Sequence, residues 1–332
     1  MSQVIHLGYP TARIPNSTLR PGDVRGGSFG AAKWHIFCGR KNPVNNPEVQ
    51  ARLRAIAEAT EELEHPPELV MRAINMCKDP RASASDLAEL ILRDPAATMK
   101  ILRLANSAFY SLSRRVPTVT QAIVVLGLGA VRNLLMTSFY RNLHHAETRE
   151  ADASLWRHAV LTAVVARELA SSLKLGDASF VESAYVGALI HDVGRLILHH
   201  REGSAYPPAG TTSTFGPNPL LASERATYGF THAELGAELA HRWYLPYDTC
   251  DAILHHHSPG ATAAANRLAS VVHIADYLAE RADHGPAHEG TAHAPDSYAL
   301  HALGWTLDEL HRFEKRLVDL NESAAEVTRI LR

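Results

Sequence analysis

From about residue 48 onward, apolar residues recur at spacings of three and four, as in helices that bury one face. Almost no stretch alternates apolar and polar residues with a period of two, so strands are not expected. Bounded by Pro, Gly or Asp, the helical segments predicted in the first half are 47–63, 66–79, 83–106 and 118–143. Within the third, Asp94-Pro95 predicts that one helix ends and another begins. The fold class is therefore all-α.

The second half continues the helical pattern and adds residues typical of helix ends. A helix over 153–175 is expected to close at Gly176, and Asp177 is placed to cap the following helix. Two pairs have the spacing of a capping box, namely Thr231 with Glu234 and Thr306 with Glu309. The helix opened by the first pair is expected to stop at Pro246.

The first 47 residues differ from the rest, because they are rich in Pro and Gly and show no sustained helical period. We expect a flexible or loosely packed extension there. The chain of 332 residues is 46% hydrophobic and 20% charged, with a net charge of −2. This balance resembles an ordinary globular protein and argues against direct nucleic-acid binding through bulk positive charge.

The cysteines and the hydropathy of the chain indicate in which cellular compartment the protein is expected. No CxxC pair occurs among the three cysteines, so a disulfide framework is not expected; they are Cys38, Cys77 and Cys250. No uninterrupted apolar run approaches the roughly 18 residues of a spanning helix, and no signal peptide is recognisable. The expectation is a cytoplasmic protein with no membrane association.

The dyad His191-Asp192, in GALIHDVGRLIL, is the main candidate for chemistry. Other residues that can share a metal with it lie on both sides, at His158, His232, His256, His257 and Asp276. Imidazole and carboxylate groups ligate first-row divalent ions, and these seven side chains suffice for one ion or two. A bound ion would lower the pKa of a water and produce a hydroxide that attacks phosphorus.

The opposing interpretation is that some of the 20 histidines fall at these places by chance and are merely hydrogen-bonded. On spacing alone, the two interpretations of the dyad have equal standing. Eight other histidines are assigned to the surface or to loops: His144, His145, His199, His200, His255, His284, His288 and His293.

Six segments together carry a family resemblance. Residues 86–136, from DLAELILRDP to VRNLLM, resemble the N-terminal half of HDOD domains. LWRHAVLTAVVARELA, VGALIHDVGRLIL, HAELGAELAHRWYLP, AILHHHSP and VVHIADYLA follow in the order of that family. The resemblance covers roughly residues 50 to 282.

This resemblance implies an all-helical domain related to the HD superfamily of metal-dependent phosphohydrolases. HDOD proteins are similar in fold to the HD-GYP cyclic-di-GMP phosphodiesterases, but they are usually bacterial signalling modules without established catalysis. The regions expected are the extension 1–47, an N-terminal helical lobe 48–143, an HD-like lobe 144–282, and a loop with C-terminal helices, 283–332.

By resemblance, a mononuclear site would be formed by His158, His191, Asp192 and Asp276. The extra histidines of HD-GYP-like proteins match His232, His256 and His257, with Asp192 as the bridge. Two features depart from that pattern: the segment SPGATAAANRL lacks a GYP motif, and Arg195 replaces the usual Lys. The planar guanidinium of Arg195 can bind phosphate oxygens, or Arg195 can be a solvated charge at a helix end.

Two functions follow from these residues. In the first, the protein is a regulatory module that binds signalling proteins, with a metal, nucleotide or phosphate ligand in the HD pocket. In the second, it is a metal-dependent phosphohydrolase acting on a nucleotide or phosphodiester, with Asp192 and Arg195 as catalytic residues. The ligand set suits manganese, iron, zinc and nickel alike.

Overall fold

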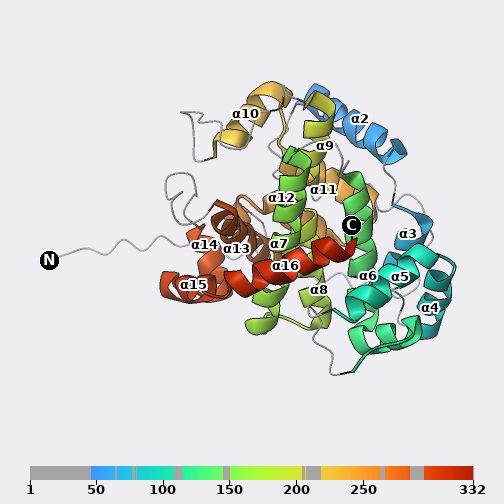
Figure 1. The fold of residues 1–332 in the computed structure, drawn as a ribbon. Coiled ribbons are helices and arrows are strands. Elements are labelled where there is room, and N and C mark those ends of the chain that lie inside the picture. The colour runs from blue at the N-terminus through green and yellow to red at the C-terminus, as the bar shows by residue number, and fades with distance from the viewer. Residues whose placement is uncertain are drawn as a thin grey trace, which may run out of the picture. The chain divides into compact units, whose positions relative to one another are not determined.

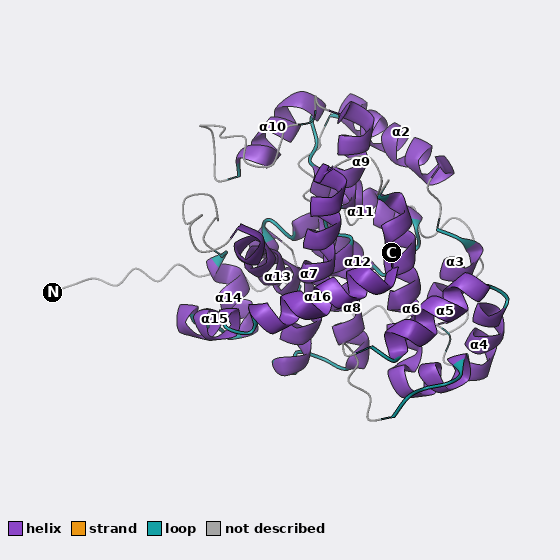
Figure 2. Cartoon of the chain, in the orientation of Figure 1, coloured by secondary structure: helices purple, strands orange, loops and turns teal. Residues whose placement is uncertain are grey.

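Helices and their connections make up the described structure (Figures 1 and 2). The computed structural model describes residues 46–63, 66–76, 79, 81–107, 114–144, 150–203, 206, 218–261, 266–284 and 295–331. No strand occurs in these ranges, which confirms the all-α fold. The predicted extension lies outside the described residues except for its last two, and Pro47 already begins the first described helix.

The N-terminal part consists of short helices packed against one long helix. Its elements are α2 Pro47–Leu63, α3 Glu68–Met76, α4 Ala84–Leu92, α5 Pro95–Ala105 and α6 Val119–Leu143. Helices α3, α4 and α5 each pack against α6, whereas α2 packs against α11 of the later part. The core between them is formed by Ile74, Leu87, Ile91, Ile101, Leu104 and Ile123.

The second part places its helices around α7, α11 and α13. These elements are α7 Glu150–Ser172, α8 Ala178–Leu189, α9 Val193–Glu202, α10 Pro219–Tyr228, α11 His232–Arg242, α12 Tyr247–His255, α13 Arg267–His284, α14 Ser297–Leu303, α15 Leu307–Glu314 and α16 Leu317–Leu331. Helix α7 packs against α8, α13 and α16, and α11 packs against α9 and α12. Five segments that carry the predicted ligands are thereby brought side by side.

Four predicted helix starts are confirmed by the side chain that caps each one. Asp94 accepts a hydrogen bond from the backbone N–H of Ala96 at 2.9 Å, and Asp177 accepts one from Phe180 at 3.0 Å. In each capping box the Glu carboxylate accepts the backbone N–H of the cap residue at 2.7 Å, for Thr231 with Glu234 and Thr306 with Glu309.

Two predicted helix ends are wrong by several residues. Helix α7 ends at Ser172 instead of Gly176, because Lys174 adopts a left-handed conformation (φ 50°). Helix α11 ends at Arg242, well before Pro246, where Tyr244 does the same (φ 56°). After α7 the backbone N–H of Leu175 donates to the carbonyl of Ala170, and after α11 that of Leu245 donates to the carbonyl of Ala240. Each helix is therefore closed without glycine.

Helix α6 is long and apolar enough to cross a membrane, with a mean hydropathy of 1.7 in its most apolar window. However, 56% of that window is buried inside the structure, against α3, α4, α5 and α8. Gly127, with φ 84°, interrupts its helical geometry. These contacts identify α6 as a core helix.

One of the histidines assigned to the surface is buried. His144 is only 3% exposed, and its ring lies edge-on to Tyr140 and Trp156 at 4.9 and 5.6 Å. The prediction failed because Trp156, on the next helix, packs on a ring that Tyr140 also contacts from one turn earlier in α6, and local sequence context does not show this packing. His145, His288 and His293 lie outside the described residues.

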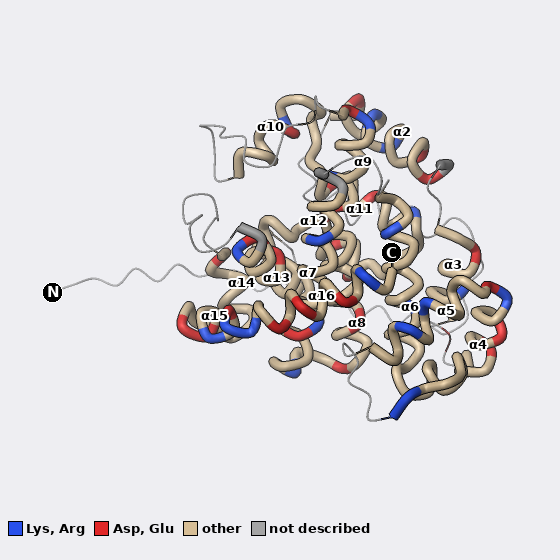
Figure 3. Tube along the Cα trace, in the orientation of Figure 1, with Lys and Arg blue, Asp and Glu red and all other residues tan. Residues whose placement is uncertain are grey.

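Charged residues of both signs are interspersed along the helices, most visibly on α15 and α16 (Figure 3). This arrangement agrees with the net charge of −2.

Candidate metal centre

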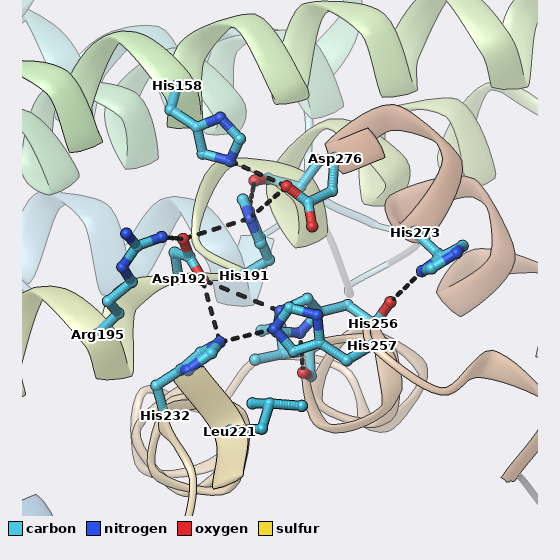
Figure 4. Close-up of polar contacts among 12 residues, drawn as sticks. His158, His191, Asp192, Arg195, Leu221, His232, His256, His257, His273 and Asp276 are labelled. Carbon is cyan, nitrogen blue, oxygen red and sulfur yellow. Dashed lines mark hydrogen bonds and ion pairs between the residues drawn. The ribbon is translucent and has the colours of Figure 1, made fainter. Parts of the chain in front are cut away.

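The seven predicted ligands come together from five places in the fold, and their side chains point toward a common centre (Figure 4). His158 lies on α7 and Asp276 on α13, while His232 is the first residue of α11. The dyad occupies the turn between α8 and α9, and the pair His256-His257 directly follows α12. The convergence that the sequence predicted is thus present.

Asp192 departs from the usual behaviour of an aspartate at a helix start. It occupies the N-cap position of α9, yet its side chain makes no capping hydrogen bond. Aspartate at this position normally accepts a backbone N–H of the first turn. Instead, the carboxylate of Asp192 faces the histidines. A residue that gives up its usual capping hydrogen bond in this way is typical of a functional site.

The first ligand group contains His158, His191 and Asp276, whose ligand atoms lie within 4.8 Å of one another. His158 Nε2 is 2.9 Å from Asp276 Oδ1, and His191 Nε2 is 3.5 Å from the same oxygen. All three residues are buried.

The second ligand group contains Asp192, His232, His256 and His257, again within 4.8 Å. Asp192 Oδ1 lies 3.2 Å from His232 Nε2 and 3.9 Å from His256 Nε2. The Nε2 atoms of His232 and His257 are 2.9 Å apart. Two imidazole nitrogens this close share one proton, in a place where a cation can replace it.

Asp192 connects the two groups. Its Oδ1 faces the second group, whereas its Oδ2 lies 3.7 Å from His191 Nε2 of the first group. Arg195 donates a hydrogen bond from Nη1 to Oδ2 at 3.1 Å. The guanidinium therefore lies next to the centre, so Arg195 is not merely a solvated charge at a helix end.

The donors fit a divalent metal, as two orphaned nitrogens show. His191 and His256 donate from Nδ1 to the carbonyls of Ala188 and Ile253, both at 2.6 Å. Each Nε2 is thereby directed at the centre, and both are buried without a hydrogen-bond partner. An unsatisfied buried polar atom costs about 1 to 3 kcal/mol, which a bound cation would offset. Imidazole and carboxylate donors suit manganese, iron, zinc or nickel.

The electrostatics favour ionised carboxylates at the centre. Burial opposes ionisation of Asp192, but His191 and His232 outweigh it and hold its pKa well below its usual range. Burial likewise opposes charging of His232, yet Glu224 and Asp192 raise its pKa to about 10. Burial and the neighbouring His191 lower the pKa of His256 to about 3, so His256 is neutral at neutral pH.

Three residues that support the ligands were not recognised in the sequence. Glu224 accepts a hydrogen bond from His232 Nδ1 at 2.9 Å, and the Tyr206 hydroxyl donates to the same carboxylate. His273 Nδ1 donates to the backbone oxygen of His256 at 2.7 Å. His273 lies within the quoted segment VVHIADYLA but was not singled out there, whereas Glu224 and Tyr206 belong to no quoted motif. The one available signal for Glu224 is that it is the sole carboxylate on the segment PLLASERATY.

A comparison with known protein families matches the part of the chain that carries most of this centre. The HDOD domain family matches residues 63–259, which is more than half of the chain. The chain belongs to the HDOD family. The matched span contains every predicted ligand except Asp276, which lies beyond its end.

Relatives of this HDOD chain include an uncharacterized protein of Treponema pallidum, 28% identical over 229 residues. That match covers 67% of this chain and 43% of the relative, so the chain spans less than half of the relative's length.

Two solved structures share the fold. An HDOD domain protein of unknown function from Geobacter sulfurreducens is 22% identical, with a TM-score of 0.65 over 84% of this chain and 99% of that chain. A candidate metal-dependent phosphohydrolase from Shewanella amazonensis is 14% identical, with a TM-score of 0.54 over 85% of this chain and 100% of that chain. At these identities the likeness establishes the fold alone.

Proposed function

We propose that this HDOD chain is a cytoplasmic regulatory module that acts by binding signalling proteins and holds one or two divalent metal ions in its HD pocket. The observation that carries the metal assignment is the pair of buried Nε2 atoms, on His191 and His256, that face the other ligands without a hydrogen-bond partner. Membership of the HDOD family supports the regulatory role.

The proposed division of labour follows the two groups. His158, His191 and Asp276 would hold one ion, and His232, His256 and His257 would hold the other. Asp192 would serve both, because its two oxygens face different groups. A bound ion would supply Lewis acidity and a fixed positive charge. The helical lobes 48–143 and 144–282 would form the frame and the surface for the partner.

A second candidate function, phosphohydrolysis, is favoured by Arg195. Its guanidinium is bonded to Asp192 and its side chain is 17% exposed, so Arg195 lies beside the centre with part of its surface open to solvent. A planar guanidinium binds phosphate oxygens in pairs. In this alternative, Arg195 would orient a nucleotide or phosphodiester and Asp192 would hold the metal beside it. The missing GYP motif weakens cyclic-di-GMP as the substrate in particular.

Turnover assays on metal-loaded protein distinguish the two candidates. The substrates are cyclic-di-GMP, a linear dinucleotide and bis-p-nitrophenyl phosphate, each assayed with manganese, iron, zinc or nickel. The regulatory proposal predicts bound metal without turnover. Turnover that His191→Ala and Asp192→Ala abolish, and that His311→Ala leaves intact, would overturn it. His311 is an exposed histidine on α15 and so provides a matched control.

A further inference from the structure

Glu224 places a negative charge behind one histidine of the centre. We propose that Glu224 is a positioning residue that orients His232 and makes the second ligand group, Asp192, His232, His256 and His257, the tighter of the two metal positions. This inference rests on the proposed metal site and adds to it the order in which the two ligand groups bind metal ions.

The contacts of Glu224 fix the orientation of the His232 imidazole ring. Both of its oxygens lie 2.9 Å from His232 Nδ1, and Oε2 also accepts the backbone N–H of His232 at 2.9 Å. Tyr206 donates its hydroxyl to Oε1. Glu224 is 0% exposed, so no water competes for these bonds. The proton of His232 is therefore held at Nδ1, and Nε2 is directed at the centre.

The other histidines with a described Nδ1 partner lack such a charge. His191 and His256 donate to the neutral carbonyls of Ala188 and Ile253. A hydrogen bond to an ionised acceptor is roughly twice as strong as one between neutral groups. A carboxylate behind a histidine also increases the basicity of its ligating nitrogen. His232 is thus a stronger donor than His191, its counterpart in the first group.

The connection between α10 and α11 keeps this pair in place. Gly229, in a left-handed conformation (φ 83°), turns the chain directly after α10. Arg225 bridges the turn, because its Nη1 bonds to the Gly229 carbonyl at 3.2 Å and to Glu234 at 2.8 Å. Helix α10 therefore presents Glu224 to the first residue of α11 at a fixed distance.

A purely structural role for Glu224 is the competing explanation. The carboxylate also satisfies the first amide of α11, and an anion at a helix start is stabilising by itself. That role would lower the free energy of unfolding of the metal-free protein together with its metal affinity, whereas the positioning role lowers the affinity of the second group and leaves the metal-free fold stable. The two explanations are separated by measuring each position alone, together with urea unfolding of the metal-free protein.

The experiment uses His158→Ala, which disables the first group, and His257→Ala, which disables the second. Glu224→Gln is added to each, and the metal-free proteins are titrated with Co²⁺, followed by visible absorption and equilibrium dialysis. We expect Glu224→Gln to weaken Co²⁺ binding roughly 10- to 100-fold in the His158→Ala background and to leave it unchanged in the His257→Ala background. In the wild type, the spectrum of the first equivalent should match the His158→Ala spectrum.

Equal weakening in both backgrounds, or no weakening in either, would overturn the proposal. Glu322→Gln, an exposed change of the same kind, is the control. If circular dichroism shows that Glu224→Gln unfolds the chain, Tyr206→Phe replaces it and should weaken only the same position, by a smaller factor. Wild-type protein that binds no Co²⁺ would refute the metal site itself, a result distinct from the others.

Discussion

Gly194 and His232 lie so close together that a methyl group on Gly194 would stand 2.1 Å from the carbonyl oxygen of His232. It would also lie 2.8 Å from the backbone nitrogen of Gly236. Helices α9 and α11 therefore meet backbone to backbone at this point. The close approach brings Asp192, at the start of α9, within reach of His232.

Gly194→Ala should accordingly separate the two helices and damage the centre. We expect the free energy of unfolding to fall by about 1 to 3 kcal/mol. The loss should lie near the upper end of this range, because the atoms that the methyl group would meet belong to the backbone of α11 and cannot move aside as a side chain can. Metal binding should weaken as well. Urea unfolding and Co²⁺ titration check both effects. Gly187→Ala is the control, because its methyl would meet Val272 at an ordinary 3.5 Å. A Gly194→Ala protein with wild-type stability would contradict this packing.

Metal should stabilise the folded chain, because the ligands converge only in the native state. At an ion concentration 100 times Kd, the free energy of unfolding should rise by about 2.7 kcal/mol. Thermal unfolding of the metal-free protein, with and without added ion, measures this. The gain should fall in His256→Ala, which removes a ligand of the second group, and persist in full in His301→Ala, which alters an exposed residue of α14. An unchanged melting temperature would count against the site.

Phe139 and Trp243 join the N-terminal part to the second part. Phe139 lies on α6 and Trp243 directly after α11, with ring centroids 5.2 Å apart in an edge-to-face arrangement. Both side chains are buried. Phe139→Ala should lower the free energy of unfolding by about 3 to 5 kcal/mol. Denaturant unfolding should retain a single transition, because the core is shared; two separate transitions would show that the lobes are independent.

Glu182 provides a pH-dependent contribution away from the metal centre. Burial raises its pKa above the usual value, although Arg167 and Arg132 oppose this. A carboxyl with a raised folded-state pKa contributes stability below its unfolded pKa of about 4.3, and that contribution is lost as pH rises through the folded value.

Glu182→Gln removes this titration while Asn133, which donates to Glu182 at 2.6 Å, can still bond to the amide oxygen. The stability of Glu182→Gln relative to wild type should therefore increase from about pH 4 upward. Chemical unfolding across this range checks the trend, with Glu322→Gln as the exposed control. A constant difference between Glu182→Gln and wild type would contradict the raised pKa.

Local signals predicted the helices well, because caps and periodicity act over a few residues. The Asp94 and Asp177 caps and both capping boxes follow directly from side-chain chemistry. The ends of α7 and α11 did not follow, since Lys174 and Tyr244 adopt a conformation that glycine usually supplies. The kink at Gly127 was likewise not predicted, because the helical spacing of apolar residues continues on both sides of it.

The ligands could be named from the sequence because their motifs recur in a fixed order, and the fold brings all seven together. Their supporting residues could not. Glu224 reaches His232 across the turn between α10 and α11, Tyr206 bonds to Glu224, and His273 reaches the backbone of His256 from another helix. Such contacts depend on three-dimensional packing, which no local spacing encodes.

The most direct test of the metal centre is the metal content of the chain after equilibrium dialysis against manganese, iron, zinc or nickel. We predict one or two ions per chain in the wild type and in His311→Ala. Asp192→Asn should bind none tightly, because it removes the carboxylate that serves both groups. Wild-type protein that retains none of these metals, or Asp192→Asn protein that retains as much as the wild type, would contradict the account.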